Sequence, residues 1–187
     1  LLCTKDDKLK DTQICIITGP RIELAITLVE RLKSLFYNLC LKFSSKETVL
    51  ELNGVRIEAF PSHHVDAMRG LANVSFIYLD EADFFPKGQQ QDARKVSERY
   101  IAKSDPYIVL VSTPNAPGQL FETMEKEKYS IYKRIKLDYT YGLGKIYSES
   151  EIQEQMKSPS FKQEYCCQYL GTIGNLFSPK QVDDVVK

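Results

Sequence analysis

Three short apolar runs, each followed by polar or turn-forming residues, constrain the fold of this chain more than any other feature. They are Gln13–Thr18, Val74–Leu79 and Tyr107–Val111. Runs of this kind are typical of strands that are buried on both faces of a parallel sheet. Helical patterns alternate with them along the chain. The alternation predicts an α/β domain with a mostly parallel sheet flanked by helices.

Two elements between the first two runs have clear signals. Apolar residues spaced by three and four predict an amphipathic helix over Ile22–Leu41. Alternating runs at Val49–Leu52 and Val55–Glu58 flank Asn53-Gly54, which predicts a hairpin because both turn positions favour positive φ.

The remaining elements continue the alternation. In chain order we expect an irregular segment over Ala59–Asn73, helices over Gln89–Ala102 and Gly118–Lys128, a strand over Ser130–Leu137, a loop over Asp138–Lys145, and helices over Glu149–Met156 and Ser160–Tyr169. The sequence shows no internal repeat and no low-complexity segment.

The composition excludes several classes of protein. Lys and Arg total 25 and Asp and Glu total 25, which argues against nucleic-acid binding by bulk positive charge but leaves room for a local basic groove. No apolar run is long enough to cross a bilayer, so we expect no membrane partner. The five cysteines include no Cys-x-x-Cys pair, which favours reduced, buried thiols and a cytoplasmic location. His63 and His64 lack further ligands nearby, so we expect no metal there.

Two acidic residues directly follow the second apolar run. A buried strand would carry Asp80 rigidly to the sheet edge, where its carboxylate could hold Mg²⁺, usually through water. Glu81 would then orient and polarise a water molecule aimed at a γ-phosphate of ATP. This is the Walker B arrangement with an added catalytic glutamate. The alternative is a solvated acidic strand end, which is common.

Ser112 and Thr113 follow the third apolar run in the same way. The carboxyl ends of parallel strands meet at one edge of a sheet, and ligands bind outside that edge. We therefore expect residues 18–20, 80–81 and 112–113 to form one site, in which the hydroxyls sense the phosphate or its attacking water. Hydroxyls also make turns and helix caps, so this pair is informative only together with the acidic strand.

Several motifs in this order resemble one family, the ATPase domain of the large terminase subunit, the motor that packages viral DNA into capsids. The resemblance runs from about Gln13 to Ser178. It rests on Thr-Gly-Pro at 18–20, Arg69-Gly70, LDEAD at 79–83, STPNAPG at 112–118, and FKQEY at 161–165 followed by Gly171 and Leu176-Phe177-Ser178. LDEAD alone would suit a superfamily 2 helicase equally well.

That resemblance implies a RecA-like P-loop NTPase fold and ATP hydrolysis coupled to translocation of double-stranded DNA. Residues 1–145 would form the ATPase core, incomplete at its N-terminus, and residues 146–187 a helical linker toward a nuclease domain that the chain lacks. The implied ligands are ATP and Mg²⁺. The implied partners are DNA, a portal protein, a small terminase subunit and further copies of the chain in a ring, in the cytoplasm of a host cell.

Arg69, twelve residues before Glu81, resembles the family position whose arginine approaches the nucleotide of the neighbouring subunit. The alternative is a structural arginine paired with Asp66. Lys126–Lys136 is the densest basic stretch and is interleaved with tyrosines, a pattern that can track a nucleic-acid backbone. Nearby glutamates dilute its charge, which favours a solvated face.

The resemblance also has a gap, because no Gly-x-x-x-x-Gly-Lys-Ser/Thr sequence occurs in the chain. Gly142–Lys145 ends in Gly-Lys, but it follows a loop rather than a strand. We expect the P-loop to precede Leu1, with Leu1–Thr4 as the end of its helix, and the isolated chain to be inactive. The alternatives are a superfamily 2 helicase or translocase core, and a non-catalytic DNA- or protein-binding module that kept the fold.

Overall fold

The computed structural model describes Leu9 and residues 11–170. The chain forms two compact units, Leu1–Ser112 and Thr113–Lys187. The expected division at residues 145 and 146 stays a prediction. The predicted features at Leu1–Thr4, Gly171 and Leu176–Ser178 lie outside the described residues.

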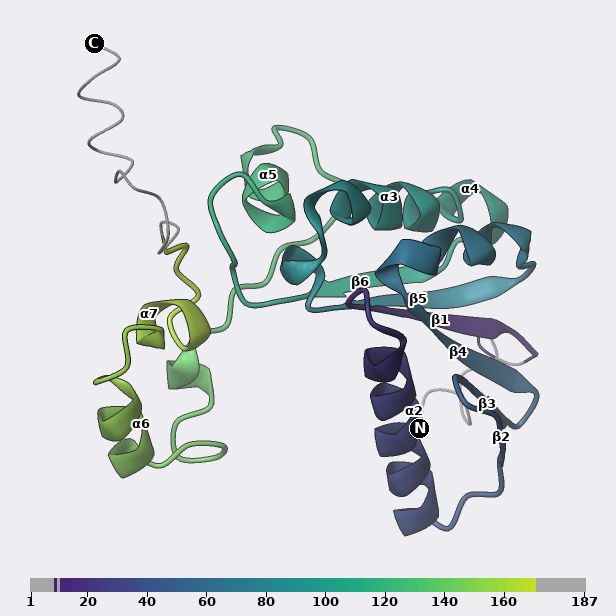
Figure 1. Cartoon of the computed structure of the whole chain (residues 1–187), viewed down its shortest axis with the longest axis horizontal. Coiled ribbons are helices and arrows are strands. Elements are labelled where there is room, and N and C mark those ends of the chain that lie inside the picture. Colours follow the sequence, from purple (N-terminus) through teal and green to yellow (C-terminus); the bar gives the residue numbers. More distant parts are fainter. Residues whose placement is uncertain (1–8, 10, 171–187) are drawn as a thin grey trace. The chain divides into compact units, whose positions relative to one another are not determined.

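The first unit is built on a six-stranded sheet with the order β2-β3-β4-β1-β5-β6 (Figure 1). Strands β4, β1, β5 and β6 run parallel, whereas β2 and β3 are antiparallel additions beside β4. The bounds are β1 Gln13–Thr18, β2 Ser44–Ser45, β3 Val49–Leu52, β4 Val55–Pro61, β5 Val74–Asp80 and β6 Tyr107–Val111. We call the side where the four parallel strands end the carboxyl edge, and the side where they begin the amino edge.

Helices cover both faces of this sheet (Figure 1). Helix α2, Ile22–Asn38, packs on β1 and β4, while the 3-10 helix η2, Ser62–Gly70, contacts α3, Lys87–Glu98. The other helices are η3 Ala82–Phe84, α4 Ile101–Ser104, α5 Leu120–Lys126, η4 Tyr139–Tyr141, α6 Glu149–Gln155 and α7 Phe161–Glu164. The mixed sheet with helices on both faces confirms the predicted α/β class.

Burial on both faces explains why β1 is an apolar run. Ile14 and Ile16 pack with Ala25 and Val29 of α2, while Cys15 and Ile17 are fully buried. Burial raises the pKa of the Cys15 thiol to about 12, so the thiol stays protonated at neutral pH. Of the cysteines in the described residues, Cys15 is buried, as predicted, Cys40 is exposed, and Cys166 and Cys167 are half-buried; all four are free thiols.

The hairpin predicted at Asn53-Gly54 is confirmed. The two turn residues have φ of 51° and 77° and join β3 to β4. A Cβ atom at position 54 would contact only the end of the Asp11 side chain, so it is the positive φ that favours glycine there.

Three predictions of secondary structure are wrong or too simple. Residues 59–73 are not irregular, because β4 continues to Pro61 and η2 follows. The helix expected over Gln89–Ala102 is two helices, α3 and α4. Ser130–Leu137 forms no strand: its alternation fits an extended chain, but no described segment pairs with it, and Ile131 and Ile135 remain exposed.

Several helices in the second unit are shorter than predicted. Helix α7 spans only Phe161–Glu164 of the expected Ser160–Tyr169, and Cys167 has a φ of 51°, which a helix does not allow. Within the described part of the chain, no helix is long and apolar enough to cross a membrane.

Candidate functional site

The carboxyl edge brings together the tips of β1, β5 and β6. Ile17 of β1 pairs with Leu79 of β5, and Asp80 pairs with Val111 of β6. Thr18, Asp80 and Ser112 therefore lie at or just beyond the ends of adjacent strands. The expected convergence of these three tips at one edge is present in the structure.

Glu81 has an unusual backbone conformation at this edge. Its φ of 53° and ψ of 44° lie in the left-handed region, which costs a residue with a branched or long side chain about 1 kcal/mol or more. The turn directs the chain from β5 into η3, and the N–H of Phe84 donates to the Glu81 carbonyl at 2.9 Å. The Glu81 side chain is exposed. A strained, exposed carboxylate after a buried strand is typical of a functional position.

Ser112 links the β5 and β6 tips through its hydroxyl. Its Oγ donates to Oε2 of Glu81 at 3.2 Å and accepts from the N–H of Asp83 at 3.3 Å. Glu81 after β5 and Ser112 after β6, which the sequence analysis placed at one site, are therefore in direct contact. Thr113 is the first residue of the second compact unit, and its role stays a prediction.

Gln90 of α3 stabilises the turn that follows Glu81. Its side-chain amide is buried and donates to the carbonyls of Asp83 at 2.8 Å and Phe85 at 2.9 Å. Asp83 itself is fully buried. These bonds tie the segment after Glu81 to the helix, which explains how a strained residue keeps its conformation. No local sequence signal distinguishes Gln90 from the glutamines beside it.

Tyr78 supports Asp80 from the same strand. The two residues lie two positions apart, so they share one face of the sheet. Burial, the charge of Asp80, a hydrogen bond to Asp80 and the charge of Glu81 together raise the pKa of the Tyr78 hydroxyl. The hydroxyl therefore keeps its proton beside the two carboxylates.

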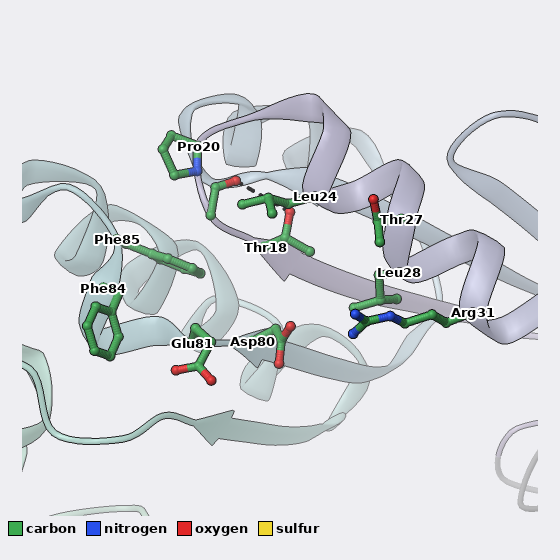
Figure 2. Close-up of a pocket in the computed structure, with 11 residues that line it drawn as sticks. Thr18, Pro20, Leu24, Thr27, Leu28, Arg31, Asp80, Glu81, Phe84 and Phe85 are labelled. Atoms are coloured by element: carbon green, nitrogen blue, oxygen red, sulfur yellow. Dashed lines mark hydrogen bonds between the residues drawn. The ribbon is translucent and has the colours of Figure 1, made fainter. Parts of the chain in front are cut away.

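A cavity of about 260 Å³ opens beside the two carboxylates (Figure 2). It is lined by Thr18, Gly19, Pro20, Leu24, Thr27, Leu28, Arg31, Asp80, Glu81, Phe84 and Phe85. Figure 2 shows Arg31 extending from α2 toward Asp80. Thr27 and Arg31 were not predicted from the sequence. Their spacing of four on the helix after β1 is the only signal, and it identifies a helix face rather than a site.

Within the described residues, no group of three or more His, Cys, Asp or Glu side chains could hold a metal ion. The donors at the edge are instead one strand-tip carboxylate with a second beside it. This set fits Mg²⁺, which keeps several waters and takes one or two carboxylates together with substrate phosphates. Asp80 is the residue that would hold the ion.

Arg69 does not join this site. It lies near the end of η2, which begins beside the carboxyl edge, where the N–H of Ser62 donates to the Gly19 carbonyl at 3.5 Å, and ends near the amino edge. There Asn73, three residues beyond η2, accepts from the N–H of Gln13 at the start of β1, at 3.1 Å. Arg69 is ion-paired with Asp66 through Nε, and its side chain is 44% exposed.

Two further motifs meet inside the second unit. The side-chain amide of Gln163, in FKQEY, donates to the carbonyls of Pro114 at 2.7 Å and Asn115 at 3.1 Å, in STPNAPG. Gly118 closes STPNAPG with a φ of 80°, and its N–H donates to Oε2 of Glu122 at 2.7 Å. That hydrogen bond is the main cause of the lowered pKa of Glu122.

A mostly parallel sheet with helices on both faces, whose carboxyl edge presents an aspartate, a glutamate and a serine, defines an α/β domain with its candidate site at that edge. Residues 28–183 match the family model of the large terminase subunit, T4-like-virus type, N-terminal domain. The chain therefore belongs to this family of large terminase subunits. Family membership sets aside the superfamily 2 helicase alternative.

Solved structures show the same fold. The large terminase of the thermophilic bacteriophage D6E matches with a TM-score of 0.62 and 14% identity, over 90% of this chain and 44% of that protein. The same protein in complex with ADP matches with a TM-score of 0.65 and 11% identity, over 85% of this chain and 41% of that one. The HK97 bacteriophage large terminase matches with a TM-score of 0.58 and 18% identity, over 86% and 40%. A search of curated proteins gave no match.

The chain thus spans less than half the length of these phage terminases. At such low identities, the likeness establishes the RecA-like fold and not the chemistry of the residues.

Proposed function

We propose that this chain is the ATPase core of a DNA-packaging terminase, in which ATP hydrolysis drives translocation of double-stranded DNA. The observation that carries this proposal is the strained Glu81, held against Ser112 beside Asp80 at the end of a buried strand. Strain that local hydrogen bonds maintain in a family of motor subunits is best explained by a chemical role.

In this proposal each residue at the carboxyl edge has one task. Asp80 would hold Mg²⁺, which would supply charge neutralisation of the phosphates. Glu81 orients the attacking water and accepts its proton. Ser112 positions the Glu81 carboxylate, and Thr113 senses the phosphate state.

Arg69 has no path to its own Asp80–Glu81 pair, because the two positions lie toward opposite edges of the sheet. We assign it to the nucleotide of a neighbouring copy, where a guanidinium can stabilise the transferring phosphoryl group. This role requires self-association into a ring. Portal protein, small terminase subunit and DNA are the further proposed partners, in the cytoplasm of a host cell.

The 187 residues hold no P-loop sequence, so they lack the backbone N–H groups and the lysine that supply most of the binding energy for a nucleotide. We therefore expect no steady ATP turnover by the isolated chain. Residues 1–145 would supply one part of the core and residues 146–187 the linker toward a nuclease domain.

The proposal is tested by measuring DNA-stimulated ATPase activity of the complete large subunit and of its Glu81→Gln variant. Glutamine keeps the size of the side chain and its hydrogen bonds but removes the negative charge. Loss of turnover with retained ATP binding supports the proposal. Equal turnover by both proteins contradicts it, and absence of ATP binding by either favours the non-catalytic module.

A further inference from the structure

A glutamine in the second unit donates to two carbonyls of the segment that leaves β6. The side-chain amide of Gln163, in α7, lies 2.7 Å from the Pro114 carbonyl oxygen and 3.1 Å from that of Asn115. Residues 112–115 form neither helix nor strand, and Pro114 is buried. A buried carbonyl in such a segment needs a donor, because leaving it unpaired is costly in free energy. The two N–H groups of one glutamine amide supply donors to both carbonyls.

The same arrangement occurs after the neighbouring strand. Gln90 donates through one amide to the carbonyls of Asp83 and Phe85, in the segment that leaves β5. Each of the two strands that carry the candidate site is thus followed by a segment whose backbone is held by one glutamine. The Ser112 hydroxyl joins the two segments, because it donates to Glu81 and accepts from the N–H of Asp83.

The chain between Ser112 and the carbonyls held by Gln163 is short and stiff. Ser112 is the last residue of the first compact unit, and Thr113 is the first residue of the second. Thr113 precedes a proline, which restricts its backbone to extended conformations. The ring of Pro114 fixes its own φ at about −65°. The position of the Pro114 carbonyl therefore limits where the Ser112 hydroxyl can lie.

Helix α7 is too short to be stable alone, but aromatic rings anchor it. The ring of Phe161 stacks on that of Tyr165, with centroids 5.3 Å apart and an interplanar angle of 15°, and lies 5.4 Å from the ring of Tyr139. The N–H of Tyr139 donates to the Tyr165 carbonyl at 2.8 Å. Gln163 therefore projects from an anchored helix, and its amide can hold the two carbonyls in place.

We propose that Gln163 is a positioning residue of the carboxyl edge. By holding the carbonyls of Pro114 and Asn115, it sets the path of the chain after β6. It thereby keeps the Ser112 hydroxyl within hydrogen-bonding distance of Glu81. Gln163 does not touch the reacting atoms and acts only through Ser112. This inference rests on the proposed function, because Ser112 has a task in turnover only if Glu81 activates water.

The first experiment measures ATP turnover by the complete large subunit. Gln163→Met keeps the length of the side chain but removes both donors, so kcat should fall about fivefold to tenfold while the KM for ATP is unchanged. Gln163→Lys keeps donors at nearly the same reach and should retain most of the activity. Gln153→Met, at an exposed glutamine of α6, is the matched control and should have no effect. A normal kcat for Gln163→Met overturns the proposal.

A double-mutant cycle separates positioning from a packing role. If Gln163 acts through Ser112, the protein with both Ser112→Ala and Gln163→Met should lose no more activity than the weaker of the two single variants. Multiplied losses, of about 25-fold or more, would show independent effects and overturn the proposal. Urea unfolding shows whether each variant folds. Where Gln163→Met does not fold, Gln163→Glu replaces it in the cycle, since glutamate keeps the shape of the side chain without its donors.

A further measurement does not depend on turnover. In amide NMR spectra of the 187-residue chain, Gln163→Met should shift the signals of Ser112 and Asp83, because the Asp83 N–H donates to the Ser112 hydroxyl. Shifts confined to Asn115 and α7 would overturn the proposal. If Ser112 and Asp83 shift but Glu81→Gln leaves turnover unchanged, Gln163 positions Ser112 while the proposed function fails. If Glu81→Gln abolishes turnover but Gln163→Met leaves kcat unchanged, the inference fails and the proposed function stands.

Discussion

The two edges of the same sheet differ in charge and in backbone strain. At the carboxyl edge, the one residue with positive φ at the tip of β5 is Glu81, a type that rarely adopts it. At the amino edge, the non-glycine residues with positive φ are Asp11, Asn53, Asn73 and Asp105, types that enter the left-handed region at low cost. The difference teaches that left-handed turns alone do not mark a site. A left-handed conformation indicates a functional site where the residue, like Glu81, adopts it at a cost in free energy and carries a carboxylate.

The two edges also differ in the sign of their charge. The carboxyl edge presents Asp80 and Glu81, whereas a cavity near the amino edge is lined by Arg69, Arg99 and Lys103. Because the sheet keeps these groups roughly 20 Å apart within one chain, they can neutralise each other only between copies. In the proposed ring, the two edges would be the complementary surfaces of a head-to-tail contact.

The largest effect is expected from Arg69→Ala, which tests whether the amino edge acts on a neighbour. The complete subunit should still bind ATP, but its hydrolysis rate should fall about 10³-fold or more, as expected for an arginine that reaches a transferring phosphoryl group. Steady-state ATPase assays and nucleotide-binding titrations measure the two quantities.

Mixing Arg69→Ala with Glu81→Gln protein sharpens that test. Each variant supplies the edge that the other lacks, so mixed assemblies should recover some DNA-stimulated activity. No recovery despite demonstrated co-assembly would show that the arginine acts within its own subunit or is only structural.

Glu81→Gln tests the carboxyl edge and should have the next largest effect. Loss of the negative charge removes the group that polarises water, and kcat should fall about 10²-fold or more. Asp80→Ala should instead weaken Mg²⁺-dependent nucleotide binding. If Glu81→Gln keeps a near-normal kcat, the water-activating role belongs to another residue, and Asp83 is the next candidate after Glu81 in the LDEAD motif.

Much of the carboxyl edge was predictable because its signals are local. A buried strand reads as an apolar run, and Asp80, Glu81 and Ser112 stand directly after such runs. Their convergence follows from the rule that parallel strands end at one edge. The hairpin at Asn53-Gly54 was predictable for the same reason, since turn geometry selects its residues.

The cavity lined by Arg69, Arg99 and Lys103 was not predictable, because it depends on how η2 packs on α3 and α4. Arg69 and Arg99 are thirty residues apart in sequence, and Tyr100 brings them together through backbone carbonyls that no local pattern marks. The strand wrongly predicted over Ser130–Leu137 shows the same limit. Alternation specifies two faces of an extended chain, whereas a strand also needs a partner.

Ser112→Ala should have a smaller effect, because the serine positions a catalytic group without replacing it. Removing the hydroxyl deletes the 3.2 Å bond to Glu81 and the acceptor for the Asp83 N–H. We expect kcat to fall about fivefold to tenfold, the size of one ordinary hydrogen bond, with little change in ATP affinity. Ser112→Thr keeps the hydroxyl and should retain most of the activity. Equal losses in both variants would indicate a packing defect instead.

The smallest effect is on stability, and it compares the two edges directly. Glu81→Gly should stabilise the folded 187-residue chain by about 1 kcal/mol, because glycine relieves the left-handed strain and the exposed hydrogen bond to Ser112 contributes little. Asn53→Gly, at a turn near the amino edge with a φ of 51°, is the matched control and should give no gain, since asparagine already tolerates this conformation. Urea unfolding of both variants measures the free energies. If Glu81→Gly stabilises the 187-residue chain and abolishes turnover in the complete subunit, the carboxyl edge loses stability in exchange for its carboxylate. Equal stability changes at the two positions would show that Glu81 carries no special strain, and would remove the observation on which its proposed role rests.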